Sequence, residues 1–175
     1  VARDFWLARI YRAWERAPIV WLAGVRRVGK TTLAQSLPAA DTLYLNCDSP
    51  RTAQSVEDPE FFFTQVKHPI VIFDEIHQLR DPSRVLKVGA DLFPNLRILA
   101  TGSSTLAASK KFSDTLTGRK RVVALTPVLH EERAAFGIPD VRTRLLRGGL
   151  PPVLLAKRPD PEFFSEWQDS YFARD

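Results

Sequence analysis

Apolar and polar residues alternate in blocks along this chain, and five short apolar runs are separated by longer segments of mixed character. The runs lie at residues 19–23, 42–47, 70–73, 96–100 and 122–125. Nearly continuous apolar strands of this length, spaced by helical segments, are typical of a parallel sheet covered on both faces. The pattern therefore predicts an α/β fold with a five-stranded parallel sheet sandwiched by helices.

The segments between the runs carry helix signals. Leu7, Ile10, Tyr11 and Trp14 recur at the spacing of one helix face, which predicts a helix over residues 3–16 that is closed by Pro18. A second helix is expected to start at residues 81–83, where Asp-Pro-Ser precedes an apolar face. A third is expected over residues 105–117, capped by one of the serines at 103–104.

The pattern changes after Pro127. From residue 128 onward, short helical patterns are broken by prolines and paired glycines, and no strand signal appears. We therefore expect a core over residues 1–127 and a small helical subdomain over residues 128–175. Because the helical pattern breaks off at residue 175, we expect this subdomain to be partial and the chain to be truncated.

The strongest chemical signal is at residues 24–31, which read Gly-Val-Arg-Arg-Val-Gly-Lys-Thr and match the phosphate-binding loop pattern. An apolar strand precedes the match and a helix-forming segment follows it, so backbone N–H groups and a helix N-terminus converge on one point. Lys30 can reach the β- and γ-phosphates, and the Thr31 hydroxyl can ligate Mg²⁺. The predicted nucleotide-binding residues here are Gly24, Arg26, Arg27, Val28, Gly29, Lys30, Thr31 and Thr32.

A second motif follows about forty residues later, where residues 70–75 read Ile-Val-Ile-Phe-Asp-Glu. The two carboxylates stand at the carboxyl end of a strand, the edge at which open parallel sheets bind ligands. Asp74 is suited to hold Mg²⁺, usually through water, and Glu75 to orient and polarise an attacking water. A carboxylate in that place favours nucleotide hydrolysis over transfer to a small molecule. We expect ATP, because no guanine-reading Asn-Lys-x-Asp segment appears.

The next strand ends in Thr101-Gly102-Ser103-Ser104, and two roles stay open for its hydroxyls. They can contact the γ-phosphate or the attacking water, or they can cap the following helix. We include Thr101 among the nucleotide-binding residues and Ser103 among the catalytic ones.

Charge and composition add limits to this interpretation. The net charge of +5 is compatible with a nucleic-acid partner but does not argue for one, since the clusters at 26–27 and 119–121 are explained by a phosphate ligand. No apolar run approaches the roughly 20 residues of a membrane helix, and no signal peptide is apparent. The single Cys47 excludes an internal disulfide, which favours a cytoplasmic protein in which Cys47 is a small buried hydrophobe. His68, His77 and His130 lack metal-ligand spacing, so no zinc site is expected.

Several motifs in series resemble those of a known family. These are the loop at 24–33, Asp-Glu-Ile-His-Gln-Leu at 74–79, Thr-Gly-Ser-Ser at 101–104, Leu-Thr-Gly-Arg at 116–119, Leu-Thr-Pro-Val-Leu-His-Glu-Glu at 125–132 and Gly-Gly-Leu-Pro at 148–151. In this order they resemble the AAA-type prokaryotic ATPases that usually carry a C-terminal nuclease-like domain of unknown function. The chain departs from that family in lacking the C-terminal domain, and at Leu129-His130, where the family often has Ser-Phe.

The resemblance implies an AAA+-like P-loop core with strand order 5-1-4-3-2, in which Asp74 and Glu75 form the Walker B motif. It also implies that Ser103 with Thr101 is the sensor position. By the same resemblance Arg119 faces the ATP of a neighbouring subunit, which implies a homo-oligomer; the alternative is a surface arginine beside Lys120.

Three functions stay open at this point. The first is a Mg²⁺-dependent ATPase whose hydrolysis moves the helical subdomain. The second is a regulatory switch that binds ATP and hydrolyses it slowly or not at all, and that reports ATP occupancy to an attached domain. The third, phosphotransfer to a small molecule, is disfavoured by Glu75.

Overall fold

The computed structural model describes residues 1–102, 110–138, 140–158 and 160–172. The elements follow the chain in the order α1 (Asp4–Trp14), β1 (Ile19–Ala23), α2 (Lys30–Ala34), η1 (Ala39–Asp41), β2 (Thr42–Asn46), α3 (Pro50–Ser55), α4 (Pro59–Gln65), β3 (Ile70–Asp74), η2 (Ile76–Gln78), α5 (Pro82–Leu92), β4 (Arg97–Thr101), α7 (Lys110–Thr115), β5 (Lys120–Ala124), α8 (Val141–Arg147), α9 (Pro151–Leu155) and α10 (Pro161–Phe172). Every predicted strand is present, and the α/β fold is confirmed.

The five strands form one sheet in the order β2-β3-β4-β1-β5, and every pair is parallel. This is the order 5-1-4-3-2 read from the other edge, so the expected topology is confirmed. Because the strands are parallel, their carboxyl ends meet at one edge of the sheet. The loop after β1 and the acidic pair at the end of β3 therefore lie at the same edge, with β4 between their strands.

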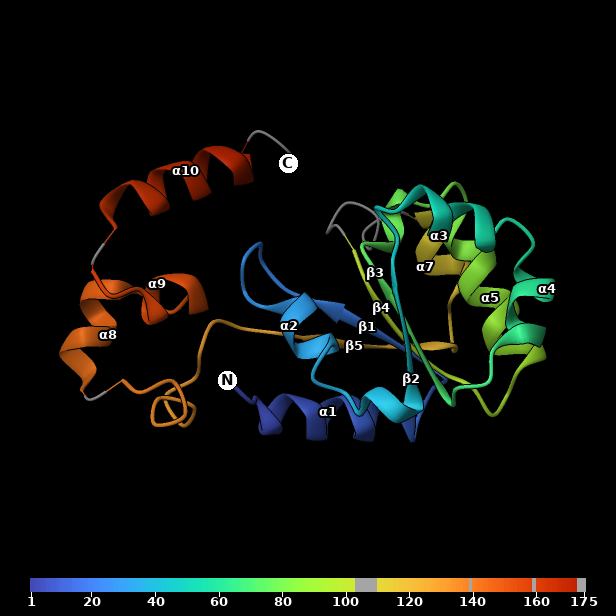
Figure 1. Ribbon diagram of the computed structural model, residues 1–175, viewed down its shortest axis with the longest axis horizontal. Coiled ribbons are helices and arrows are strands. Elements are labelled where there is room, and N and C mark those ends of the chain that lie inside the picture. The colour runs from blue at the N-terminus through green and yellow to red at the C-terminus, as the bar shows by residue number, and fades with distance from the viewer. Residues whose placement is uncertain (103–109, 139, 159, 173–175) are drawn as a thin grey trace.

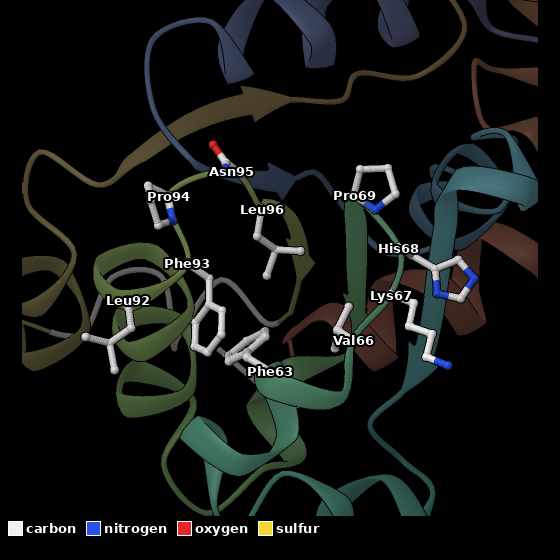
Figure 2. Close-up of a pocket in the computed structure, with 10 residues that line it drawn as sticks. All are labelled: Phe63, Val66, Lys67, His68, Pro69, Leu92, Phe93, Pro94, Asn95 and Leu96. Carbon is white, nitrogen blue, oxygen red and sulfur yellow. The ribbon is translucent and has the colours of Figure 1, made fainter.

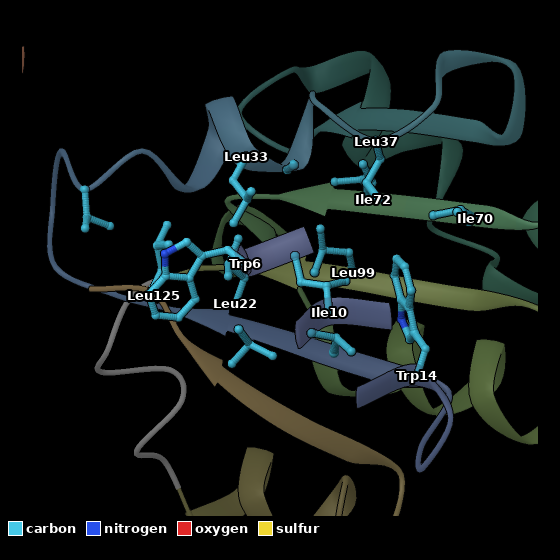
Figure 3. Close-up of a cluster of buried hydrophobic side chains, with 14 of the residues drawn as sticks. Trp6, Ile10, Trp14, Leu22, Leu33, Leu37, Ile70, Ile72, Leu99 and Leu125 are labelled. Carbon is cyan, nitrogen blue, oxygen red and sulfur yellow. The ribbon is translucent and has the colours of Figure 1, made fainter. Parts of the chain in front are cut away.

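Helices cover both faces of the sheet (Figure 1). Val20 and Leu22 of β1 face a cluster with Trp6, Ile10 and Trp14 of α1 and with Leu33 of α2 (Figure 3). The alternate residues Ile19 and Trp21 face a second cluster with helices α4, α5 and α7. Since helices cover both faces of the central strands β1, β3 and β4, both sets of alternating positions there are mostly apolar, which is why these strands read as continuous apolar runs.

Some boundaries differ from the sequence-based expectations. Helix α1 ends at Trp14, ahead of the expected end at residue 16. Strand β5 begins at Lys120, two residues earlier than the apolar run, because it is an edge strand that pairs with β1 alone and so accepts exposed polar residues. Asp81 caps α5 as expected, by accepting from the Arg84 N–H. Of the helix expected over 105–117, the described part spans Lys110–Thr115, and the proposed serine caps lie outside the described residues.

After β5 the described residues form helices and turns, as expected. Val128, Phe136, Ile138 and Leu154 make a small cluster of their own. Leu150, Val153 and Phe163 instead join the larger cluster that contains Val28 of the loop after β1. The helical part is therefore packed against that loop, which faces α9 and α10 in Figure 1. The expected boundary at residue 127 stays a prediction.

In the part of the chain that the structure describes, no helix has both the length and the apolar character needed to cross a membrane. Cys47 is 2% exposed, and burial raises the pKa of its thiol to about 12. Its interpretation as a small buried hydrophobe agrees with both observations.

Candidate nucleotide site

The loop between β1 and α2 has the backbone conformation that its glycines allow. Gly24 and Gly29 have positive φ angles of 154° and 98°, and a Cβ atom on Gly24 would lie 2.6 Å from the Leu125 carbonyl oxygen. A side chain at residue 24 would therefore collide with the chain that leaves β5. Arg27 also has a positive φ, 63°, which few residues other than glycine adopt. The loop therefore has three residues with positive φ within six positions, and its backbone turns tightly before the start of α2.

Lys30 begins α2 and curls back over this loop. Its Nζ donates to the Gly24 carbonyl at 2.9 Å and approaches the Val25 carbonyl at 3.4 Å. Burial lowers the pKa of the ammonium below its ordinary value, although the nearby Glu75 and Asp74 carboxylates favour the charged form. The cation thus lies over the loop and close to the acidic pair, where a polyphosphate between them would contact it.

Asp74 is the centre of a hydroxyl network at the carboxyl edge of the sheet. It is 3% exposed and accepts from Thr31 Oγ1 at 2.8 Å, Tyr44 Oη at 2.7 Å and Thr101 Oγ1 at 2.6 Å. The two predicted Mg²⁺ ligands, Thr31 and Asp74, are therefore in direct contact. Three hydroxyl donors on one carboxylate fix its position, from which a remaining lone pair can ligate a hard cation.

The donor set suits Mg²⁺ bound together with a nucleotide. Among the described residues, no group of three or more His, Cys, Asp or Glu side chains could hold a metal by itself. One hydroxyl and one carboxylate match the way Mg²⁺ is held in nucleotide sites, by one or two protein oxygens with water and phosphate completing the octahedron. Thr31 and Asp74 would hold the ion.

Glu75 follows Asp74 but points elsewhere. Its φ of 56° ends the strand abruptly, and its backbone N–H donates to Thr101 Oγ1 at 3.0 Å. The side chain is 35% exposed, and its Oε2 lies 3.3 Å from His77 Nδ1 without hydrogen-bond geometry. Left-handed backbone in a residue other than glycine costs energy and is concentrated at functional sites. Here the left-handed backbone at Glu75 separates the buried carboxylate of Asp74 from the carboxylate of Glu75, which water can reach.

The structure gives Thr101 a different role from direct nucleotide contact. Its side chain is fully buried, its hydroxyl donates to Asp74, and it accepts from the Glu75 N–H. Thr101 therefore positions the acidic pair from the neighbouring strand. Ser103, expected as a catalytic residue, lies outside the described residues.

The structure places both arginines of the loop in contact with α10. The Arg27 guanidinium lies 4.9 Å from the ring centroid of Phe163 on α10. Trp167, also on α10, donates its indole N–H to the Arg26 carbonyl at 3.0 Å. These contacts tie α10 to the loop, and they place the Arg27 guanidinium, which the sequence suggested for phosphate, against the Phe163 ring. Val28 is buried in the core, so its backbone alone is available to a ligand, and Thr32 is exposed on α2.

Arg119 lies away from this group. It precedes β5, at the amino edge of the sheet, and its Nε and Nη2 donate to the two carboxylate oxygens of Asp91 at 2.6 and 3.0 Å. These hydrogen bonds hold the pKa of Asp91 below its ordinary value. Arg119 therefore lies at the opposite edge of the sheet from the 24–31 loop of its own chain.

Sequence analysis missed Tyr44. It lies on β2, beside the strand that carries Asp74, and burial together with its hydrogen bond to Asp74 raises its pKa above the ordinary value. A tyrosine two residues before the carboxyl end of β2 is the signal that could have suggested it, because that end adjoins the acidic pair.

A separate hollow of about 440 Å³ lies at the opposite, amino edge of the sheet (Figure 2). It is lined mainly by apolar residues that precede β3 and β4: Phe63, Val66, Lys67, His68, Pro69, Leu92, Phe93, Pro94, Asn95 and Leu96. None of the predicted site residues lines it.

Comparison with known families identifies the family to which this chain belongs. The family model described as an AAA domain matches residues 16–134, which include the loop, the acidic pair and the strand that ends in Thr101. Uncharacterized proteins of Mycobacterium bovis and Mycobacterium tuberculosis are each 32% identical over 167 residues, or 94% of this chain. The chain spans 36% of the length of these relatives.

Solved structures share the fold at low sequence identity. A DNA replication initiation factor superposes with a TM-score of 0.52 at 12% identity, covering 97% of this chain and 58% of that one. The RuvB Holliday junction branch migration motor of Thermotoga maritima gives 0.54 at 15% identity, covering 97% and 70%. At these identities the likeness shows the fold alone.

Proposed function

This chain belongs to the AAA domain family, and we propose that it binds Mg–ATP at the 24–31 loop and hydrolyses it. One observation carries the proposal: Lys30, Thr31 and Asp74 come from two separate motifs and converge at one edge of the sheet. Bound Mg²⁺ would neutralise phosphate charge as it develops during transfer.

In this proposal, different groups bind the phosphates, position the cation and activate the attacking water. The loop N–H groups and the Lys30 ammonium bind and orient the phosphates. Tyr44 and Thr101 hold Asp74 in the geometry that places the cation. Glu75 lies in reach of water and is suited to orient the attacking molecule and accept its proton.

We further propose that nucleotide state is coupled to the helical part through the loop. Trp167 contacts the backbone of Arg26, and Phe163 contacts the side chain of Arg27. A rearrangement of the loop around phosphate would therefore change how α10 packs against it. Such coupling serves either a motor or a switch.

Turnover separates the ATPase from the slow or non-hydrolysing switch. Phosphate release is measured at saturating Mg–ATP, alone and with double-stranded or single-stranded DNA, a partner with which the net charge of +5 is compatible. Release that stops when Lys30 is replaced by Ala supports the ATPase. Binding of ATP without release under every condition favours the switch, and release that needs a small-molecule acceptor favours phosphotransfer.

Arg119 is expected to act on the ATP of a neighbouring subunit in a homo-oligomer. An arginine brought to the γ-phosphate stabilises charge in the transition state and contributes roughly 10³–10⁵ in rate in characterised cases. It must first leave Asp91, an exposed pair whose contribution to stability is small. Specific activity should therefore rise with protein concentration, and mixing Arg119→Ala with Lys30→Ala subunits should recover activity. Turnover that is independent of concentration, with no recovery on mixing, leaves Arg119 as a surface charge.

A further inference from the structure

Arg3, just before α1, forms a buried ion pair with Glu132, far along the chain. Its Nε and Nη2 donate to the two carboxylate oxygens at 2.7 and 2.8 Å, and the two side chains are 5% and 8% exposed. Burial alone would raise the pKa of Glu132, but hydrogen bonds from Arg3, the Leu129 N–H and Trp6 hold it below its ordinary value. The carboxylate is therefore charged at neutral pH, and the pair is a two-pronged, charge-assisted contact.

The same guanidinium reaches two backbone carbonyls. Nη1 donates to Val28 in the phosphate loop and Nη2 to Thr126 in the segment after β5, each at 3.2 Å. Glu132 in turn accepts from the Leu129 N–H at 2.9 Å and the Trp6 indole at 3.3 Å. One buried cation thus joins the start of α1, the loop and the connection to the helical part.

Stability alone does not account for this arrangement. A buried ion pair roughly breaks even against well-packed apolar residues of the same volume, because both charges lose their hydration. The neighbouring core already holds these segments together through Trp6, Val28 and Leu125. What an apolar pair could not supply is a donor directed at the Val28 carbonyl.

That donor fixes the direction of a peptide plane. In a planar trans peptide, the carbonyl of one residue and the N–H of the next point in opposite directions. Since the Val28 carbonyl points at the buried Arg3, the Gly29 N–H points away from Arg3 and the interior. Gly29 immediately precedes Lys30, in the part of the loop that is suited to cradle an anion.

We propose that Arg3, held by Glu132, is a positioning residue that turns the Val28–Gly29 peptide so that the Gly29 N–H faces the nucleotide's phosphates. This role rests on the proposed ATP site. It also gives a purpose to Glu132 in the Leu-Thr-Pro-Val-Leu-His-Glu-Glu segment, which the nucleotide chemistry leaves unexplained.

The test uses two variants of the whole chain and a matched control. Arg3→Met with Glu132→Gln removes both charges together and keeps an acceptor for Trp6 and Leu129. Arg3→Lys keeps the charge opposite Glu132 but loses the planar fork that reaches Val28 as well. Arg12→Met, which removes an exposed arginine from α1, is the control.

Two readouts are taken on variants whose far-UV circular dichroism is native. Without nucleotide, hydrogen exchange of peptides covering residues 24–31 should quicken in both variants and stay unchanged in the control. Calorimetry should show Mg–ATP affinity falling about tenfold, the loss expected for one misdirected N–H to a charged group.

Loop exchange equal to that of the wild type in a folded Arg3→Lys chain would overturn the positioning role, as would unchanged Mg–ATP affinity. Should the double variant fail to fold, the Arg3→Lys chain decides. Because the exchange experiment needs no nucleotide, it tests whether Arg3 positions the loop independently of whether the chain binds ATP. A wild-type chain that does not bind Mg–ATP removes the proposed function, while the exchange still decides whether Arg3 holds the loop.

Discussion

Replacing Lys30 by Ala is expected to weaken Mg–ATP binding thirty- to a hundredfold, a loss of roughly 2–3 kcal/mol. Its ammonium lies over the loop, in contact with the Gly24 carbonyl, and burial leaves it less hydrated than a surface lysine. Charge-assisted hydrogen bonds in such a setting are about twice as strong as neutral ones. Titration calorimetry with Mg–ATP measures the change directly.

Lys67→Ala is the matched control, because Lys67 is an exposed lysine beside the hollow at the other edge of the sheet. It removes the same charge from the chain and should leave affinity at the wild-type value. If the Lys30→Ala chain bound Mg–ATP as tightly as the wild type, ATP would not bind through the 24–31 loop. The same conclusion would follow if Lys30→Ala and Lys67→Ala lost the same amount of affinity.

Glu75→Gln is expected to keep Mg–ATP binding and to lower hydrolysis by about 10²-fold or more. The amide keeps the shape of the side chain but cannot accept a proton from water. The geometry favours this separation, since Glu75 is partly exposed while Asp74 is buried and accepts from three hydroxyl donors. Phosphate release and calorimetry on the same preparation measure the two effects.

Asp74→Asn is the companion variant, and it should change a different quantity. An amide at this position places an N–H₂ group among the hydroxyls and weakens the hold on the cation, so the Mg²⁺ concentration needed for half-maximal binding should rise. If the Glu75→Gln and Asp74→Asn chains lose binding and turnover in parallel, the division of roles between the two carboxylates is wrong.

The parts of the site that could be predicted from the sequence are those encoded locally. Residues 24–31 form a contiguous motif, and the strand that ends in Asp74 is recognisable as an apolar run followed by two acidic residues. Parallel topology then brings the ends of β1 and β3 to one edge. Lys30, Thr31 and Asp74 therefore come together as expected.

The residues that sequence analysis missed act through contacts between distant segments. Tyr44 and Asp74 are 30 positions apart, Arg3 and Glu132 are 129 apart, and Trp167 reaches Arg26 across 141. No local pattern encodes such pairings, because the packing of whole elements brings them about. Each of these side chains also has an ordinary structural interpretation as a strand tyrosine, a helix-flanking arginine or an amphipathic-helix tryptophan.

Arg27 shows how tertiary structure redirects a side chain. Next to a phosphate loop, its charge suggested a nucleotide contact, yet its guanidinium lies against the Phe163 ring. A cation over an aromatic face is favourable by about 0.5–2 kcal/mol, and the contact became available only because α10 packs beside the loop. The sequence contains both residues but does not indicate that they meet.

The most direct test of the central claim is the location of Mg–ATP on the folded chain, measured by hydrogen exchange with and without the nucleotide. Saturating Mg–ATP should slow exchange in peptides covering residues 24–31 and in the peptide that contains Asp74 and Glu75, and Lys30→Ala should abolish this protection. Protection confined to other segments, such as the hollow beside Phe63 and Leu96, or no protection at all, would contradict an ATP site at the 24–31 loop.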